Sequence, residues 1–333
     1  MKAVIPVAGV GTRLRPHTYA LPKVLLNVAG KPILAHILDE MLTYGVTEAT
    51  IITGYMGNLI EEFVTHKYPQ MKVDFVEQKQ MLGLGHAIWV GKDTYKSDQQ
   101  LMIILGDTIF DVDLHNQIDK NVSSIGVKSV DDPSRFGVVL LDENKKYNEK
   151  YIIRKFIEKP ETPVSNLAIV GLYYIANSSL LVEALNTLIE KNIKTKNEYQ
   201  LTDALQIMLD LGEQFTTFPV EGWHDCGKHE TLLSTNRFLL QRYPKQKQIN
   251  GSVIIPPCFI SENAIIENSI LGPFTSVASG AVVKDSIIKN SIISYEAKVM
   301  KSMLYDSIIG NEAEVLGKFN KLNVGNSSTI ELE

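Results

Sequence analysis

The stretch Ala3-Val-Ile-Pro-Val-Ala-Gly-Val-Gly-Thr-Arg-Leu-Arg15 decides how the larger part of this 333-residue chain is expected to fold. Its first residues, Ala3–Val7, form an apolar run of strand size, and a glycine-rich loop follows at once. In α/β sheets, ligands bind in loops beyond the carboxyl ends of the strands. Gly9 and Gly11 would let backbone N–H groups approach phosphate oxygens, and the two arginines would add positive charge.

The loop fits neither of the two common phosphate-binding fingerprints. Leu14 stands where a dinucleotide-binding loop has its third glycine, and the Lys-Ser/Thr end of a Walker loop is missing. Taken alone, the loop could therefore be an ordinary turn. Its place after the first strand is what favours a binding function.

Strand-like and helix-like segments alternate after this loop. Residues 33–42 and 58–66 show helical spacing of apolar side chains, while residues 49–53, 73–76 and 101–105 resemble strands. A further helix is expected over Glu230–Arg242. The alternation predicts a Rossmann-like α/β domain over residues 1–243, with a mixed, mostly parallel sheet and helices on both faces. The loops after Val7 and Leu105 are then the places to look for a site.

A different period begins after the polar segment Tyr243–Gly251, which we interpret as a linker. Apolar residues recur every five or six positions, and Asn/Asp-Ser-Ile phrases recur among them. This is the spacing of hexapeptide repeats. The sequence therefore predicts a left-handed β-helix over residues 251–333. The apolar positions are Ile254, Ile260, Ile266, Leu271, Val277, Val283, Ile288, Ile293, Val299, Leu304, Ile309 and Val315.

Composition argues against several classes of protein. The net charge of −5 does not favour a surface for nucleic acid. Two cysteines, Cys226 and Cys258, are too few for a disulfide framework. No apolar run reaches the length of a membrane span, and the N-terminus does not resemble a secretory signal. We therefore expect a cytoplasmic protein that binds neither membranes nor nucleic acid.

Charged residues next to predicted strands are candidates for chemistry, and each has an ordinary alternative. Asp107, after an apolar strand, could bind Mg²⁺ or cap a turn. Asp225 could be a second metal ligand or the N-cap of the following helix. Glu158 could accept hydrogen bonds from sugar hydroxyls and Lys159 could bind a phosphate, or the two could form an exposed ion pair. Lys23, in Leu-Pro-Lys-Val-Leu, would alone be read as a solvated surface group.

Taken in order, these phrases resemble the sugar-1-phosphate nucleotidyltransferase family over about residues 1–240. The matching phrases are Gly-x-Gly-Thr-Arg, Pro-Lys, Gly-Lys-Pro, Gly-Asp, Glu-Lys-Pro and Trp-x-Asp-x-Gly. The resemblance implies an enzyme that joins a nucleoside triphosphate to a sugar 1-phosphate and releases pyrophosphate. It implies that Arg13 steadies the triphosphate and the leaving pyrophosphate, and that Lys23 contacts the reacting phosphates. Asp107 and Asp225 resemble the ligands of the cofactor Mg²⁺.

The resemblance also implies substrate contacts at other positions. Gln78 and Gly83 resemble the base-reading segment, and Lys196 matches a further basic contact to phosphate. The full set of implied substrate-binding residues is Ala8, Gly9, Gly11, Gln78, Gly83, Gly137, Glu158, Lys159, Ile169 and Lys196.

Details of the motifs favour a pyrimidine nucleotide. The guanylyl and adenylyl branches of the family usually carry Gly-Thr-Ala near Gly83, and this chain does not. Gly83-Leu-Gly-His-Ala87 resembles glucose-1-phosphate uridylyltransferases, whereas Leu105-Gly-Asp-Thr-Ile-Phe110 resembles thymidylyltransferases. Leu21-Pro-Lys-Val-Leu resembles N-acetylglucosamine-1-phosphate uridylyltransferases. UTP and dTTP both stay open, with glucose 1-phosphate favoured over N-acetylglucosamine 1-phosphate and mannose 1-phosphate.

The sequence is also compatible with two other functions. Acyltransferases built on hexapeptide repeats typically need a histidine base in the coils, but the last histidine here is His229, before the repeats begin. A regulatory subunit that only binds sugar nucleotides could lose its metal carboxylates, whereas both are present. We therefore expect the β-helix to be an oligomerisation or regulatory element, with a homo-oligomer formed through it, rather than a unit that catalyses a second reaction.

Overall fold

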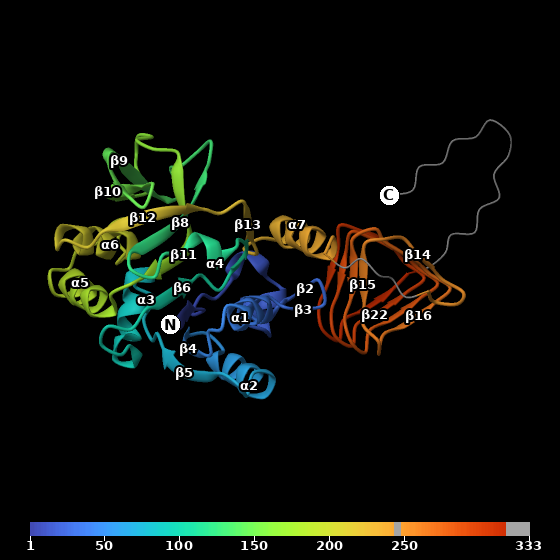
Figure 1. Ribbon diagram of the computed structural model, residues 1–333. Coiled ribbons are helices and arrows are strands. Elements are labelled where there is room, and N and C mark those ends of the chain that lie inside the picture. Colours follow the sequence, from blue (N-terminus) through green and yellow to red (C-terminus); the bar gives the residue numbers. More distant parts are fainter. Residues whose placement is uncertain (243–247, 318–333) are drawn as a thin grey trace. The chain divides into compact units, whose positions relative to one another are not determined.

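The chain divides into two compact units in the computed structural model, which describes residues 1–242 and 248–317 (Figure 1). The first unit contains residues 1–26 and 31–232. The second contains residues 27–30 and everything described from Leu233 onward. Most of the expected linker, and the chain from residue 318 on, lie outside the described residues.

A nine-stranded mixed sheet forms the centre of the first unit, in the order β5-β4-β1-β6-β11-β8-β12-β10-β9. Pairing is parallel from β5 through β6 and between β8 and β12, and antiparallel elsewhere. A separate antiparallel pair is made by β7 and β13. The strands are β1 (Lys2–Pro6), β4 (Glu48–Thr53), β5 (Lys72–Glu77), β6 (Leu101–Ile104), β7 (Thr108–Asp111), β8 (Ser123–Ser129), β9 (Gly137–Tyr147), β10 (Lys150–Glu158), β11 (Leu167–Ile175), β12 (Phe215–Pro219) and β13 (Gly222–Asp225).

Helices connect these strands much as the apolar spacing predicts. The expected helix at residues 33–42 is α1, and the one at residues 58–66 is α2. α3, α5 and α6 pack against one another and share a core cluster with the sheet. The helices are α1 (Ile33–Thr43), α2 (Gly57–Lys67), α3 (Leu84–Val90), α4 (Leu114–Gln117), α5 (Ser178–Glu190), α6 (Leu201–Asp210) and α7 (His229–Leu240), with short 3-10 turns at η1 (Thr12–Leu14), η2 (His17–Tyr19), η3 (Lys23–Leu25) and η4 (Lys92–Thr94).

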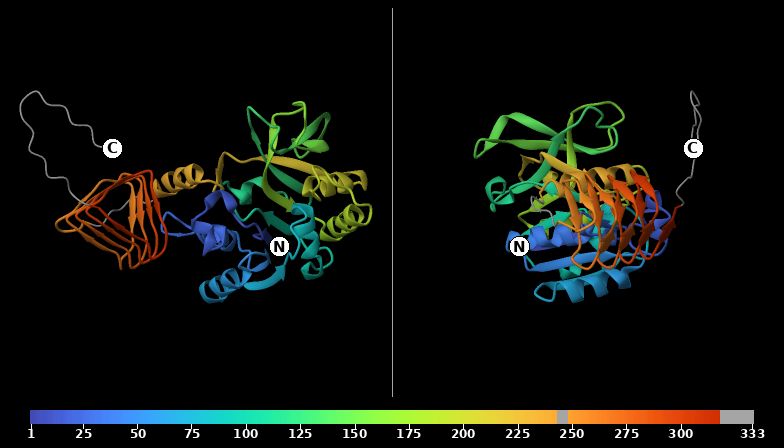
Figure 2. Two further views of the ribbon diagram at one scale, coloured as in Figure 1. Left: turned by 180° about the vertical axis from the view of Figure 1, so that it is seen from behind. Right: turned by 90° about the vertical axis from the view of Figure 1, so that its right-hand side faces the viewer.

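The second unit is built from three parallel sheets of four short strands, the arrangement of a left-handed β-helix (Figure 2). The first sheet contains β14 (Val253–Ile254), β17 (Ile270–Leu271), β20 (Ile287–Lys289) and β23 (Met303–Tyr305). The second contains β15 (Cys258–Ile260), β18 (Thr275–Val277), β21 (Ile292–Ile293) and β24 (Ile308–Ile309). The third contains β16 (Ile265–Glu267), β19 (Val282–Lys284), β22 (Lys298–Met300) and β25 (Glu314–Leu316).

The periodic apolar residues fill the inside of this coil. Ile254, Leu271, Ile288 and Leu304 pair in register along the first sheet. Corresponding residues of the other two sheets do the same, and all twelve positions predicted from the spacing belong to one apolar cluster. The spacing thus reports one inward side chain per side of the triangular coil.

The Asn/Asp-Ser-Ile phrases form corners of the coil. Asn268 and Asp285 adopt left-handed backbone angles, with φ of 45° and 50°, a conformation that these two residue types tolerate better than most. Each following serine turns inward. The Ser269 hydroxyl accepts the backbone N–H of Ser286 at 3.1 Å, and the Ser286 hydroxyl accepts that of Ser302 at 3.2 Å. The serines therefore supply acceptors to backbone donors that are buried between coils.

A short hairpin, β2 (Asn27–Val28) and β3 (Lys31–Pro32), leads from η3 into α1. Among the described residues, no helix combines the length and the apolar character needed to cross a lipid bilayer. Cys226 and Cys258 are both buried.

Neighbouring isoleucines on β16 offer a test of the inward spacing. Ile266 is buried, whereas Ile265 is 48% exposed. We expect Ile266→Ala to lower the free energy of unfolding of the β-helix by about 2–5 kcal/mol, because it leaves a cavity in the coil. Ile265→Ala should change it by less than about 1 kcal/mol. Denaturant unfolding of both variants measures this, and equal losses would contradict the inward assignment.

Candidate active site

Parallel pairing of β1 with β6 brings the two loops singled out in the sequence to one edge of the sheet. Val4 is opposite Ile103, and beyond the strands the Gly106 N–H donates to the Pro6 carbonyl at 3.4 Å. A side chain at position 106 would lie only 2.4 Å from Val7 Cγ1, so glycine permits this close approach. The loops after β1 and β6 therefore form adjacent walls of one site.

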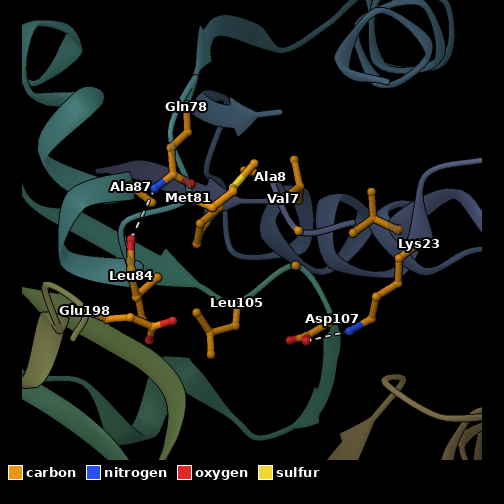
Figure 3. Close-up of a pocket in the computed structure, with 15 residues that line it drawn as sticks. Val7, Ala8, Lys23, Gln78, Met81, Leu84, Ala87, Leu105, Asp107 and Glu198 are labelled. Carbon is orange, nitrogen blue, oxygen red and sulfur yellow. Dashed lines mark hydrogen bonds and ion pairs between the residues drawn. The ribbon is translucent and has the colours of Figure 1, made fainter. Parts of the chain in front are cut away.

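A pocket of about 340 Å³ opens between these loops (Figure 3). Six of the residues implied by the resemblance line it, and they come from both loops, from η3 and from the segment before α3. These six are Ala8, Gly9, Lys23, Gln78, Gly83 and Asp107. The remaining lining is largely apolar, with one carboxylate from Glu198.

Glycine suits positions 9 and 11 of the first loop for two different reasons. Gly11 has φ of +69°, and a Cβ there would lie 2.9 Å from Lys23 Cβ, so both its backbone angle and its packing require glycine. A Cβ at Gly9 would meet no protein atom within 4 Å among the described residues. Gly9 therefore leaves open space at the pocket, which suits close approach of a ligand to the backbone.

Lys23 and Asp107 form an ion pair at the floor of the site, where Figure 3 shows the lysine reaching across to the carboxylate. Lys23 Nζ lies 2.6 Å from Asp107 Oδ2, and the lysine side chain is only 10% exposed. Burial raises the pKa of Asp107, but the Lys23 ammonium and the Thr108 hydroxyl lower it more, so the pKa lies below its usual range. The carboxylate is consequently ionised at neutral pH, and Lys23 is not a solvated surface group.

The β7–β13 pair brings Asp225 next to Asp107. Asp225 pairs with Thr108, and the Cys226 N–H donates to the Asp107 carbonyl at 2.9 Å. Helix α7 begins at His229, so Asp225 is not its N-cap. Two neighbouring carboxylates are hard oxygen donors of the kind that hold Mg²⁺ together with substrate phosphates and water. The donor set therefore fits the metal that the resemblance implies.

Arg13 lies beside this second carboxylate. A Cβ at Gly227 would be 3.0 Å from Arg13 Nη2 and 2.8 Å from Asp225 Oδ1, so both groups border the same small space. The Thr231 hydroxyl also donates to Asp225 Oδ2 at 3.1 Å. Arg13 is thus placed at the carboxylate pair and not along the pocket wall.

Gln78 is buried at the other end of the pocket and is held by its amide nitrogen. Its Nε2 donates to the Gly83 carbonyl at 3.2 Å and lies 3.1 Å from Nδ1 of His86. Burial lowers the pKa of His86, so its neutral ring can accept that bond. Since the amide nitrogen is engaged, the Gln78 carbonyl oxygen is left to accept a hydrogen bond from a ligand.

Glu158, Gly137 and Ile169 meet in a second cluster. The Thr202 hydroxyl donates to Glu158 Oε2 at 2.7 Å, and Lys159 Nζ lies 3.4 Å from Oε1. A Cβ at Gly137 would be 2.8 Å from Glu158 Oε2 and 3.2 Å from Ile169 Cδ1. The glutamate side chain is only 8% exposed, so this is not the exposed ion pair of the alternative interpretation.

Lys196 is exposed and is the residue least tied to the site. Its Nζ lies 3.5 Å from Glu161 Oε1, which places it near the loop that follows Lys159. It does not line the pocket.

Sequence reasoning missed several residues of the site. Met81 and Leu84 line the pocket but carry no chemical signature. Glu198, two residues after Lys196, also lines it. Thr202, four residues further on, donates a hydrogen bond to Glu158. A carboxylate just ahead of α6 and a hydroxyl in its first turn were a sequence signal for these two residues.

Comparisons with known proteins indicate the family of this chain. The family model described as "Nucleotidyl transferase" matches residues 2–242. Glucose-1-phosphate thymidylyltransferase of Streptomyces antibioticus is 27% identical, with all of both chains covered. The bifunctional protein GlmU of Methanocaldococcus jannaschii is 32% identical over 93% of this chain and 78% of its own length. A crystal structure of UDP-glucose pyrophosphorylase complexed with UDP-glucose superposes with a TM-score of 0.60 at 25% identity, covering 72% of this chain and 98% of that one.

The family match covers residues 2–242, which include almost all of the first unit, and the two relatives align over 93% or more of this chain. The chain therefore belongs to the nucleotidyl transferase family and is an enzyme of its sugar-1-phosphate nucleotidyltransferase branch.

Proposed function

We propose that the chain transfers a uridylyl or thymidylyl group from UTP or dTTP to glucose 1-phosphate, in a reaction that depends on Mg²⁺. N-acetylglucosamine 1-phosphate and mannose 1-phosphate are the alternative acceptors. One observation carries the proposal: the glycine-rich loop, the Lys23–Asp107 pair and Gln78 surround a single pocket of about 340 Å³. That pocket offers backbone donors, a cation, a carboxylate and a base-reading amide together.

The chemistry needs no covalent intermediate on the enzyme. A phosphate oxygen of the sugar 1-phosphate attacks the α-phosphorus, a new P–O bond forms, and the bond from the α-phosphorus to the bridging oxygen breaks as pyrophosphate leaves. The protein must hold two polyanions together and neutralise charge that grows on the leaving group. Lys23, Arg13 and Lys159 are suited to that task. Bound Mg²⁺ would supply further neutralisation of phosphate charge at Asp107 and Asp225.

The base is proposed to be a pyrimidine. The free carbonyl oxygen of Gln78 can accept the N3–H of uracil or thymine, while its amide nitrogen is held by Gly83 and His86. Among the relatives, one is named for thymidylyl transfer and one solved structure contains UDP-glucose. These names support glucose and a pyrimidine together, and they support UTP and dTTP equally.

The sugar is proposed to bind at the Glu158 cluster. Glu158 is buried and partly satisfied by Thr202, and its other oxygen faces Lys159. A carboxylate held in this way can accept sugar hydroxyls. Gly137 and Ile169 would then form the wall of the sugar pocket, and Lys196 would lie at its edge.

A substrate matrix tests this function directly. Pyrophosphate release would be measured for UTP, dTTP, ATP and GTP against the 1-phosphates of glucose, N-acetylglucosamine and mannose. We expect turnover with UTP or dTTP and glucose 1-phosphate to exceed that with either purine nucleotide by at least about a hundredfold. Faster turnover with ATP or GTP would refute the pyrimidine assignment. A clear preference for another sugar would replace glucose.

The two carboxylates provide a test of the metal site. Asp107→Asn and Asp225→Asn should each lower kcat by at least about a hundredfold, because each removes a charged ligand. Binding of Mn²⁺ to the protein in the presence of UTP, followed by electron paramagnetic resonance, should weaken in both variants. Asp111→Asn, at the far end of the β7 strand that follows Asp107, is the matched control. Full turnover in EDTA, or unchanged Mn²⁺ binding in the folded variants, would show that these aspartates do not hold the metal.

We further propose that the β-helix assembles a homo-oligomer and that the protein acts in the cytoplasm. The outer face of the first sheet carries an aliphatic ladder of Val253, Ile270, Ile287 and Met303, which pair in register. Their exposed fractions run from 37% to 77%. Because the four side chains form one continuous apolar row, a twofold axis at its middle would pair it with the same row of a second copy. We therefore commit to a second copy of this chain as its occupant.

Light scattering of full-length variants tests the assembly. Changing Ile270 and Ile287 together to lysine should reduce the molar mass to that of a smaller assembly, since like charges would oppose each other across the contact. Ile265→Lys, at a 48% exposed isoleucine on the third sheet, is the control. A wild-type monomer would end the proposal, and so would an unchanged mass in the double variant.

A further inference from the structure

Residues 27–30 belong to the second unit although they lie early in the chain, between the catalytic-loop residue Lys23 and helix α1. Asn27, Val28 and Ala29 are 5%, 0% and 1% exposed. Ala29 adopts a left-handed backbone with φ of 47°, which is unfavourable for alanine unless its surroundings hold it. The segment is therefore seated firmly in the second unit.

Asn236, a fully buried residue of α7, bridges this segment to the coils. Its Oδ1 accepts the Ala29 N–H at 2.9 Å, and its Nδ2 donates to the Phe274 carbonyl at 3.1 Å. Both ends of one amide thus join three separate stretches of the second unit. A buried bond of this kind is costly to lose, because each freed backbone group stays unsatisfied.

Two further contacts fix the same segment. A Cβ at Gly30 would lie 2.3 Å from the Phe259 ring, so the ring packs against the bare backbone. Burial raises the pKa of the Tyr295 hydroxyl, and the nearby Asn27 side chain opposes that rise in part. The segment therefore touches the coils at both of its ends.

Lys23 is connected to residues 27–30 by a short turn that is closed by backbone hydrogen bonds. The turn η3 is closed by the Leu25 N–H donating to Pro22 and the Leu26 N–H donating to Lys23. Asn27 follows directly. Because no loose loop intervenes, the position of residues 27–30 restricts where the Lys23 backbone can lie.

We propose that Asn236 is a positioning residue that acts through Lys23, so that the β-helix unit contributes to the transfer reaction by seating residues 27–30. The proposal rests on the role proposed above for Lys23. It differs from a purely structural role, which would stabilise the second unit without any effect on the reacting phosphates.

Hydrogen exchange distinguishes the two roles when Asn236→Ala is compared with Asn290→Ala. Asn290 is also a buried asparagine of the second unit, but its amide bonds Asp306 within the coils. In Asn236→Ala we expect amides of residues 20–32 to exchange faster by on the order of tenfold, with the coil amides of residues 287–309 unchanged. In Asn290→Ala we expect the reverse. Unchanged exchange over residues 20–32 in Asn236→Ala would overturn the proposal.

Kinetics provide the second measurement. Asn236→Ala should lower kcat on the order of tenfold while the KM for the sugar 1-phosphate stays within about twofold, because a small misplacement affects the reacting phosphates most. In a Lys23→Met background the same substitution should have no further effect. An equal loss in both backgrounds would show that Asn236 does not act through Lys23.

Other outcomes separate this proposal from the proposed site. If Lys23→Met alone leaves kcat unchanged, the role of Lys23 is wrong and the positioning proposal falls with it. If Asn236→Ala does not fold, Phe259→Leu removes the ring that packs on Gly30 and is taken through both measurements. Unchanged exchange over residues 20–32 and unchanged kcat in that variant would overturn the proposal as well.

Discussion

The parallel pairing of β1 with β6 is the constraint on which the site depends. Parallel neighbours end at the same edge of a sheet, so the loops after Pro6 and Ile104 must emerge side by side. The apolar side chains of β1 and β6 are buried, and this burial fixes the register of the pair. A shift of one residue would move every side chain of a strand to the opposite face of the sheet. Gly106 then allows the two loops to touch. Without the parallel pairing of β1 with β6, Gly9 and Asp107 would not be brought to the same pocket.

Charge is balanced locally before any substrate arrives. Lys23 is nearly buried, and its ammonium is paired with Asp107 at 2.6 Å. Leaving either ion unpaired there would be costly, so the pair holds both groups in place in the free enzyme. Arg13 lies at the second carboxylate, next to Gly227. Cationic and carboxylate side chains thus lie next to one another at this edge of the sheet. A local cluster of this kind can bind a polyanion even though the whole protein has a net charge of −5.

The sequence was sufficient for the β-helix and for most of the first unit because both follow from periodicity. One apolar residue per side of the coil is a local rule, so Ile254 through Val315 could be assigned without tertiary information. The order of motifs likewise indicated Asp107 and Gln78, which do line the pocket. That Asp225 lies next to Asp107 could not be derived from the sequence, because it depends on the pairing of β7 with β13. Glu198 and Thr202 reach the site only through packing against the segment around Gly83 and against Glu158.

Residues 27–30 show most clearly that contacts between distant parts of the chain cannot be derived from the local sequence. Their sequence, Asn-Val-Ala-Gly, reads as a turn between a loop and a helix, and nothing local connects it with a residue more than two hundred positions away. Yet Asn236 accepts the Ala29 N–H, and Phe259 packs on Gly30. The domain boundary expected at residue 243 follows the change in the spacing of apolar residues. The second compact unit, however, begins at Leu233 and also includes residues 27–30. Because a buried backbone donor must find an acceptor, the Ala29 N–H depends on Asn236 of α7, whose own amide nitrogen is held by the Phe274 carbonyl in the coils.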